Sequence, residues 1–381
     1  MNGSSRGSAG GRPGRIGRIL KVTLPLVALV SAAVAAAGPI EVRFVTIAPE
    51  GTPWSEQMTA MKARVEKESG GRLEFKLYLG GQLGGEVETL RSLQRGRVQA
   101  WGGSVGALAG LIPELQLMEL PYLFRSLDEA DYVLDEVLFT PYAELLAKQG
   151  FTLQSWNENG WRSIGSKDKP VLTPADAKGL KVRSQPSPIH LRMWKALGAN
   201  PVPISVPEVL TSLQTGVVDA FDNSPLFTTA TSWHTAIKHY AMTQHMYQPG
   251  AVIFNKAFLD KLPEDLRKIL LGDAKAEAVG IRTAIRALEP EIIKLMETEG
   301  VKIYRMNDTQ RQAFATVLEP LHTEFAKTVG SDLLGKVKAA LAKYRAEHPA
   351  GAAAPAPPAG KPVAKPALAK PVPAKPAPVA K

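Results

Sequence analysis

Cysteine is absent from this chain of 381 residues, and histidine occurs only six times. Without cysteine the chain forms no disulfide bond and offers no thiolate to a metal ion or a lipid, so its fold depends on a hydrophobic core. The two histidines nearest in sequence, His234 and His239, are five residues apart, whereas two ligands on one helix face need a spacing of about four. The sequence therefore predicts no metal site and no cofactor.

A hydrophobic run long enough to cross a membrane is also missing. The longest apolar stretch, residues 22–37, has 16 residues and is interrupted by Pro25, whereas a membrane-spanning helix needs about 20. It follows residues 1–21, which carry five basic residues and no acidic one. This order is typical of a secretory signal peptide. We expect cleavage near Ala37 and export by the general secretory route, because no twin arginine is present.

Acidic and aromatic residues are missing from the other end of the chain. Residues 350–381 consist mainly of alanine, proline and lysine, so they cannot bury a core and are expected to form a disordered tail. Two interpretations of this tail remain open. It is either a solvated linker without a partner, or a segment drawn to anionic cell-envelope polymers by weak, salt-sensitive charge.

The formal net charge of +10 comes from these two ends. Each end contributes five basic residues and no acidic one, which leaves 36 basic and 36 acidic residues in the rest of the chain. A nucleic-acid-binding domain needs a basic face on the folded part. The charge pattern therefore excludes nucleic acid as a partner.

One segment of the chain occurs twice. Residues 88–104 and 208–224 are identical at 9 of 17 positions and lie 120 residues apart, which is too far for solenoid repeats of roughly 20–50 residues. Each copy reads as a helix, a glycine stop, a buried strand and a polar segment, Gly102–Ser104 or Asp222–Ser224. Because ligands of open α/β sheets sit beyond the carboxyl ends of the strands, we expect both polar segments to be loops that line one cleft between two similar lobes.

The rest of the body alternates strand-like and helical runs, which predicts an α/β fold. Thr52 is expected to cap a helix that begins with a proline, and Thr173 with Asp176 to form a capping box. Asn159-Gly160 is expected to be a turn between two strands. About 310 residues remain between the two ends, enough for two domains.

These motifs together resemble the substrate-binding proteins of TRAP (tripartite ATP-independent periplasmic) transporters, the DctP-like family. The resemblance implies two similar α/β lobes in a periplasmic-binding-protein fold, with a ligand cleft between them and a long bracing helix. It runs from about Glu41 to Glu319, and eight segments carry it in order: VTIAPEGTPW (45–54), GGQLGGEVETLRSLQRG (80–96), ALAGLIPELQLMELPYLFR (107–125), NGWRS (159–163), TPADAKGLKVRSQPSP (173–188), ALGANPVPI (196–204), VLTSLQTGVVDAFDNSP (209–225) and NKAFLDKLPEDLR (255–267).

The implied function is transport rather than catalysis: the two lobes close around a small mono- or dicarboxylate, which is delivered to membrane permease subunits. We expect lobe I to comprise residues 38–159 and about 248–287, and lobe II residues 160–247 and about 288–346.

The resemblance also implies ligand-binding residues. Arg183 matches the arginine that clamps the ligand carboxylate, and a guanidinium fork suits that role because it donates two parallel hydrogen bonds. Arg162 matches a second carboxylate or water-mediated contact, and Asn223 a further polar contact. Ala220 replaces the glycine usual in this segment, and an added serine follows Asn223. The other expected ligand contacts are Ser104, Trp54 and Gln185.

Pro186 stands where members that bind sialic acid have an asparagine. Specificity for sialic acid is therefore not implied.

A secreted serine hydrolase is the alternative function. Ser104 lies in GGSVG, which matches the nucleophile motif G-x-S-x-G. Only about 65 residues would precede it after cleavage, and no His-Gly-Gly segment lies upstream. The second copy repeats the serine as Ser224 without the flanking glycines, so the serine follows the repeat rather than a catalytic triad.

Overall fold

The computed structural model describes residues 38–349. The predicted signal peptide and tail lie outside these residues, so both remain predictions. By its contacts the chain divides into two units, Met1–Pro39 and Ile40–Lys381. All helices and strands of the described residues belong to the second unit. None of these helices combines the length and the apolar character that a membrane span requires.

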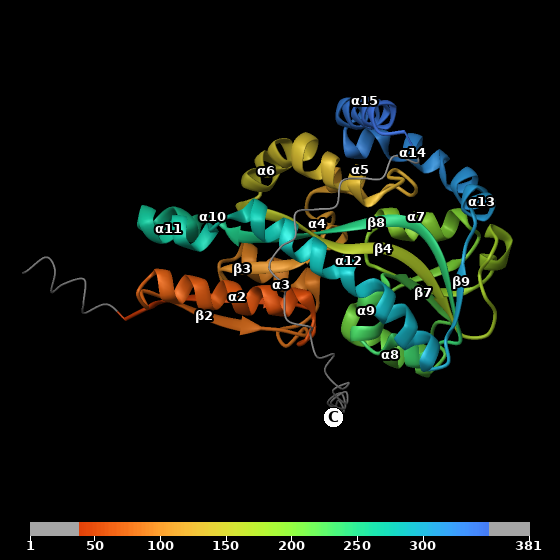
Figure 1. Ribbon diagram of the computed structural model, residues 1–381, viewed down its shortest axis with the longest axis horizontal. Helices are drawn as coiled ribbons and strands as arrows, with labels where there is room; N and C mark the ends of the chain where they lie inside the picture. Colours follow the sequence, from red (N-terminus) through yellow and green to blue (C-terminus); the bar gives the residue numbers. More distant parts are fainter. Residues whose placement is uncertain (1–37, 350–381) are drawn as a thin grey trace, which may run out of the picture. The chain divides into compact units, whose positions relative to one another are not determined.

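Nine strands of the described residues form one sheet, in the order β2-β1-β3-β8-β4-β7-β5-β6 with β9 beside β8 (Figure 1). The order is symmetric about the β8–β4 pair, because a parallel trio stands on each side of it. The strands are β1 (Ile40–Thr46), β2 (Leu73–Tyr78), β3 (Ala100–Ser104), β4 (Phe151–Ser166), β5 (Lys181–Ser184), β6 (Asn200–Pro203), β7 (Ala220–Asn223), β8 (His239–Asn255) and β9 (Lys302–Arg305).

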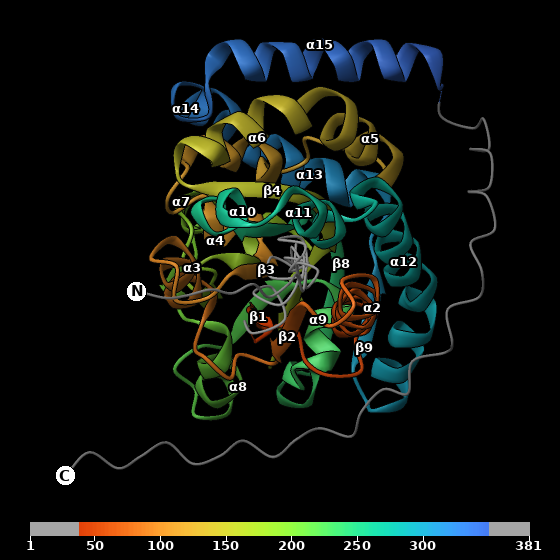
Figure 2. The same cartoon turned by 90° about the vertical axis from the view of Figure 1, so that its left-hand side faces the viewer.

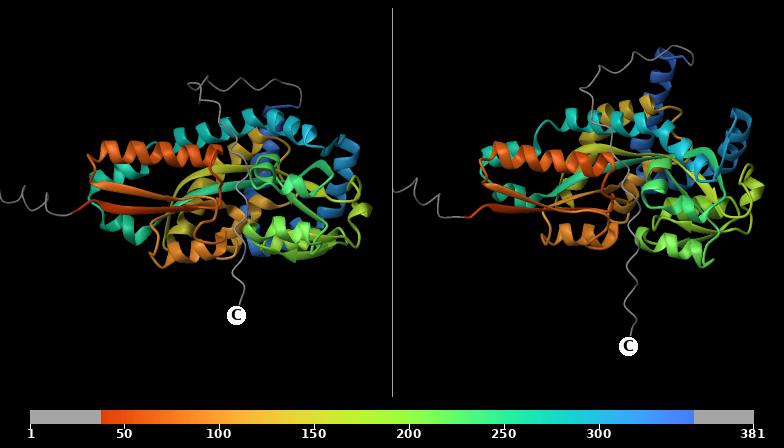
Figure 3. Two further views of the ribbon diagram at one scale, coloured as in Figure 1. Left: turned by 90° about the horizontal axis from the view of Figure 1, so that it is seen from below. Right: turned by 60° about the horizontal axis from the view of Figure 1, so that its bottom comes forward.

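The sequence repeat is a structural repeat. Phe44 of β1 pairs with Ala100 of β3, and Val182 of β5 pairs in the same parallel manner with Ala220 of β7. Ala100 and Ala220 are matching positions of the two copies. We call β1–β3 with their helices lobe I, and β5–β7 with their helices lobe II. The prediction of two similar lobes is confirmed, and the two trios lie at opposite ends of the sheet (Figure 3).

Matching helices connect the strands of each lobe. Thr52 caps α2 with a proline at the first helical position, as predicted. Gly96 and Gly216 follow the next helix of each lobe with φ of 70° and 76°, the left-handed conformation expected at a helix end. The helices are α2 (Pro53–Glu68), α3 (Glu86–Gln94) and α4 (Val105–Leu108) in lobe I, and α7 (Pro188–Ala196), α8 (Val206–Gln214) and α9 (Pro225–Ala230) in lobe II.

Two long strands join the lobes. β4 and β8 pair antiparallel along their length. The end of β8 also pairs with β3 of lobe I and its start with β9, while the end of β4 pairs with β7 of lobe II. The turn predicted at Asn159-Gly160 is wrong, because the chain continues through this point as part of β4. Gly160 has φ of 96° and sits in a bulge, while Glu158 and Gly160 keep their pairing with β8.

The two polar segments predicted as loops are also different in the structure. Gly102 pairs with Val252 of β8, and Asn223 pairs with Ser163 of β4, so both segments extend the strands. Ser104 is the last residue of β3 and pairs with Gly250, whereas Ser224 directly follows β7. Ser104 and Ser224 then cap α4 and α9 by accepting a hydrogen bond from the backbone three residues later.

The hydrophobic core lies on both faces of the sheet. Val42 and Phe44 of β1 belong to one buried cluster and Val45 to the other, and Val252 and Ile253 of β8 divide in the same way. Successive side chains of a strand point to opposite faces. The core is therefore divided by sheet face and not by lobe, and both clusters contain residues of both lobes.

A long helix braces the molecule, as the resemblance implied. α12 (Ala274–Thr298) packs on β4 and also contacts α2 of lobe I and α9 of lobe II (Figure 2). The capping box predicted at Thr173 is present. At the start of α8, the Ser205 hydroxyl donates to the Glu208 carboxylate. The boundaries expected for the two lobes remain predictions.

The remaining helical segments are η1 (Pro113–Glu119), α5 (Leu127–Tyr132), η2 (Val133–Leu138), α6 (Phe139–Lys148), η3 (Pro174–Ala177), η4 (Trp233–Ala236), α10 (Lys256–Lys261), α11 (Glu264–Leu271), α13 (Asp308–Leu318), α14 (Pro320–Val329) and α15 (Ser331–Glu347). Figure 2 shows α15 lying above α5 and α6. These segments cover the faces and ends of the sheet, and η1 also supplies a side chain to the surroundings of the site described below.

Candidate ligand-binding site

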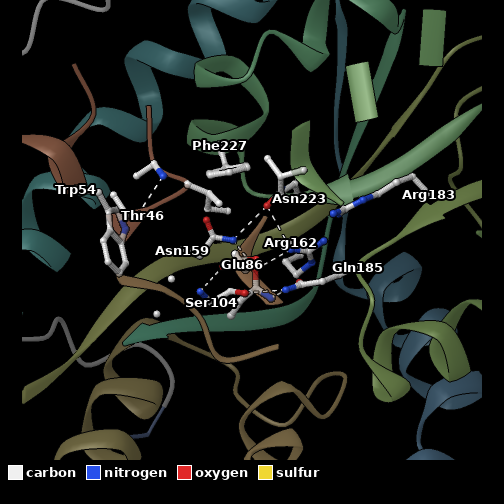
Figure 4. A pocket seen from close by; sticks show the side chains of 16 residues that line it. Thr46, Trp54, Glu86, Ser104, Asn159, Arg162, Arg183, Gln185, Asn223 and Phe227 are labelled. Carbon is white, nitrogen blue, oxygen red and sulfur yellow. Dashed lines mark hydrogen bonds between the residues drawn. The ribbon is translucent and has the colours of Figure 1, made fainter. Parts of the chain in front are cut away.

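A cavity lies where the two repeats meet at the ends of β3 and β7 (Figure 4). It measures about 40 Å³, room for about three water molecules. The structure brings all six predicted ligand-binding residues together in its lining: Trp54, Ser104, Arg162, Arg183, Gln185 and Asn223. Whether each of them contacts a ligand remains a prediction.

Arg183 is a buried cation without a counter-charge. It extends from β5 toward the cavity (Figure 4), and its side chain is 2% exposed. Its Nε donates to the carbonyl of Ile204 at 2.9 Å, and its guanidinium lies 5.1 Å from the ring centre of Trp233. Among the described residues, no carboxylate lies within ion-pair distance of it, and its two terminal nitrogens have no hydrogen-bond acceptor.

The surroundings of Arg183 oppose its charge. Burial lowers its pKa to about 9, repulsion by Arg162 adds to this effect, and Asp222 and Glu86 counteract it. The guanidinium nevertheless stays protonated at neutral pH. A buried charge without a partner is unfavourable. An anion that accepts hydrogen bonds from the two free terminal nitrogens of Arg183, the fork of its guanidinium, would supply the missing counter-charge.

Arg162, in contrast, is already paired within the protein. It is 1% exposed, and its Nε lies 2.5 Å from a carboxylate oxygen of Asp222. Although burial disfavours the charge of Asp222, Arg162 and the neighbouring His245, 3.4 Å away, hold the pKa of this carboxyl well below its usual range. Arg162 also donates to the side chains of Gln248 at 2.7 Å and Asn223 at 3.3 Å. It therefore orients other lining residues.

Ser104 and Gln185 form a hydrogen bond between the lobes. The Gln185 amide donates to the Ser104 hydroxyl at 2.7 Å, and its carbonyl oxygen accepts from Gln248 at 2.8 Å. The Ser104 hydroxyl also accepts from the backbone of Ala107. Among the described residues, these partners include no histidine or other base, whereas a serine nucleophile needs an adjacent base. The geometry of Ser104 is that of a helix cap.

Trp54 forms one wall of the cavity. Its indole donates to the backbone carbonyl of Glu158 on β4 at 2.9 Å. The ring lies so close to Gly102 and Gly250 that a Cβ atom at Gly250 would overlap with it, and one at Gly102 would come within 3.1 Å. Glycine at these two strand positions lets the indole lie directly against the sheet.

Sequence reasoning missed Glu86, which also lines the cavity. It is the first residue of α3, and its carboxylate accepts a hydrogen bond from the backbone of Ser104 at 2.6 Å. Burial raises the pKa of this carboxyl, and Arg183 opposes the shift. The signal was present, because Glu86 precedes the first repeat by two residues and its counterpart Val206 lines the cavity too.

Gln248 is a second residue that sequence reasoning missed. Its side chain donates to Glu119 of η1 and to Gln185, and it accepts from Arg162 and Asn159. All of its hydrogen-bonding groups are thus used within the protein. No local pattern marks this glutamine, since its partners come from distant segments that only the fold brings together.

Comparison with known proteins identifies the family. The sequence profile of the family described as bacterial extracellular solute-binding protein, family 7 (DctP) matches residues 44–328. This chain belongs to that family. The C4-dicarboxylate-binding periplasmic protein DctP of Rhodobacter capsulatus is 31% identical over 312 residues, which cover 81% of this chain and 93% of that protein.

Two solved structures of TRAP periplasmic solute-binding proteins are also similar to the chain. One, from Sulfurospirillum deleyianum with bound succinate, has a TM-score of 0.76 at 27% identity and covers 80% of this chain and 99% of its own. Another, from Polaromonas with bound D-erythronate, has a TM-score of 0.74 at 27% identity with the same coverage. The TRAP resemblance and the two-lobed fold are confirmed, and the hydrolase alternative receives no support.

Proposed function

We propose that this family member captures a small organic acid by placing the ligand carboxylate against the free fork of Arg183. The observation that supports this is a fully buried guanidinium, facing a cavity between two lobes, without an acidic partner among the described residues. Two parallel hydrogen bonds from the fork would fix the orientation of the carboxylate. The relatives named for a C4-dicarboxylate, succinate and D-erythronate bind ligands of this chemical class.

Capture requires movement of the lobes. The cavity has room for only about three water molecules, and the Gln185–Ser104 bond spans it. A carboxylate of four or more carbons would enter when the lobes separate and would be enclosed when they close. The Ser104 hydroxyl accepts from Gln185 and from the backbone of Ala107, and among the described residues no histidine contacts it. We therefore infer that the protein binds its ligand without transforming it.

The location and the partner follow from this role. The relatives are named as periplasmic proteins, and the basic and apolar leader fits export to that compartment. We infer that the closed, loaded protein docks on the membrane subunits of a TRAP permease and releases the acid there. Cleavage near Ala37 would free the protein to travel between ligand and permease.

A thermal-shift screen of small organic acids tests the proposal. A ligand at a hundred times its dissociation constant stabilises a protein by about 2.7 kcal/mol. Carboxylates should raise the unfolding midpoint, and the matching primary amides should not, because an amide brings no negative charge to Arg183. A screen in which only neutral sugars stabilise the protein would contradict the proposal.

A further inference from the structure

We propose that Glu86 makes this site select a carboxylate that carries a hydroxyl group at its far end over a plain dicarboxylate. The inference rests on the proposed function, since it assumes that Arg183 holds the first carboxylate. It specifies the chemical group at the end of the ligand opposite that carboxylate. The observation behind it is an acidic side chain in the lining of a cavity that is otherwise suited to an anion.

Glu86 and Arg183 reach the cavity from different lobes. Glu86 begins α3 of lobe I, Arg183 extends from β5 of lobe II, and both line the cavity. They interact electrostatically but do not come within ion-pair distance. The space between them is thus open to a molecule that meets a cation with one end and a carboxylate with the other.

The position of Glu86 is fixed while part of its carboxylate stays available. One oxygen accepts from the backbone of Ser104 at 2.6 Å, which anchors the side chain. The Ser104 hydroxyl also lies near this carboxylate, and among the described residues no cation forms an ion pair with it. Burial raises the pKa of Glu86, whereas Ser104 and the charge of Arg183 oppose the shift, and the start of a helix also favours a negative charge. In its ionised form Glu86 offers a hydrogen-bond acceptor to the ligand.

A second carboxylate would find no suitable partner in this lining. The lining contains two cations, and Arg162 is already neutralised by Asp222 at 2.5 Å. The free charge of Arg183 would be taken by the first carboxylate. A second carboxylate near Glu86 would face a like charge, which is unfavourable at short distance outside bulk water. A hydroxyl group would instead donate to Glu86, and hydrogen bonds to a charged acceptor are stronger than neutral ones.

A purely structural role for Glu86 makes a different prediction. On that view, the side chain only holds the backbone of Ser104 and the start of α3. Glu86→Gln separates the two roles, because the glutamine oxygen can still accept from Ser104 while the negative charge is gone. Glu88→Gln is the matched control, since Glu88 is an exposed residue of the same helix that does not line the cavity.

Isothermal titration with 4-hydroxybutyrate and succinate tests the inference, because both are acids of four carbons and differ only in the far end. The wild type should prefer 4-hydroxybutyrate at least tenfold. Glu86→Gln should move the ratio of the two affinities toward succinate at least tenfold, and Glu88→Gln should leave it unchanged.

The outcomes distinguish the two proposals. Binding of either acid with an affinity ratio that Glu86→Gln leaves unchanged would overturn the inference and keep the proposed function. A wild-type preference for succinate would overturn it as well. If neither acid nor any other carboxylate bound to the wild type or to Glu86→Gln, both proposals would fail.

Discussion

The amide of Gln185 donates to the hydroxyl of Ser104 at 2.7 Å, and this bond joins the last residue of one repeat to the strand end of the other lobe. Each serine of the repeat caps a short helix, but only Ser104 also bonds across the cavity. The pair therefore links local capping to closure of the two lobes, and it gives a direct way to measure how much closure contributes to binding.

Ser104→Ala should weaken ligand binding modestly. One neutral hydrogen bond contributes about 0.5–1.5 kcal/mol, so we expect a loss of about two- to twelvefold in affinity by isothermal titration. Ser224→Ala is the control, since it removes the matching cap and leaves the cleft bond intact. Equal affinities of the two variants would show that the Gln185–Ser104 bond does not favour closure, and a Ser104-dependent ester hydrolysis would restore the hydrolase alternative.

Arg183→Ala should remove most of the binding. It leaves a buried ligand carboxylate unpaired, which is worth roughly 2–5 kcal/mol, about thirty- to several-thousand-fold in affinity. Arg183→Lys should restore only part of the loss, because an ammonium group cannot make two parallel bonds. Isothermal titration with a carboxylate found in the thermal-shift screen measures the affinity of both variants. Arg192→Ala, which removes a half-exposed arginine paired with Glu324, should bind as the wild type does; wild-type affinity of Arg183→Ala would refute the clamp.

Local patterns were sufficient to predict the lobes and most of the site. The repeat identified the paired trios, and Thr52 and Gly216 marked helix ends because capping and left-handed glycine act within a few residues. Family motifs placed Arg162 and Arg183 on the cavity. These signals are all short-range or carried by one continuous segment.

The errors came from long-range pairing. Asn159-Gly160 has the sequence of a turn, but β8 supplies hydrogen bonds on the other side and turns it into a bulged strand. Gly102 and Asn223 have glycine or polar neighbours in the sequence, which predicted loops. They lie in strands because β8 and β4, respectively, pair with them. Gln248 was missed because its four partners are contributed by separate parts of the chain.

Arg183→Met should stabilise the protein when no ligand is present. The substitution replaces an unpaired buried cation, whose pKa is lowered chiefly by burial, with an apolar side chain of similar length. Binding sites often give up stability in this way, and single stabilising changes are worth about 0.5–2 kcal/mol. The midpoint of thermal unfolding should therefore rise while binding is lost. A lower midpoint for Arg183→Met would mean that the free cation is compensated in the ligand-free protein.

Asp222→Asn should destabilise the fold strongly, because it leaves Arg162 buried without a counter-charge. Breaking a buried ion pair by removing one partner amounts to about 3–5 kcal/mol, which urea unfolding can measure. Asp219→Asn is the control: its partner Lys181 is 3.6 Å away and half-exposed, and such surface pairs contribute about 0–1 kcal/mol. If Asp222→Asn lowered the free energy of unfolding no more than the control does, the Arg162–Asp222 pair would not stabilise the fold as proposed.

The same variant has a defined pH dependence. The pKa of Asp222 is lowered in the folded state, since Arg162 and His245 outweigh the opposing effect of burial. A carboxyl of this kind stabilises the fold above its unfolded pKa of about 3.9 and loses that contribution as the pH falls through its lower folded pKa. The difference in unfolding free energy between wild type and Asp222→Asn should stay constant from about pH 7 to about pH 5 and shrink below about pH 4. A difference that already shrinks between pH 7 and pH 5 would show that the carboxyl is not held ionised by Arg162.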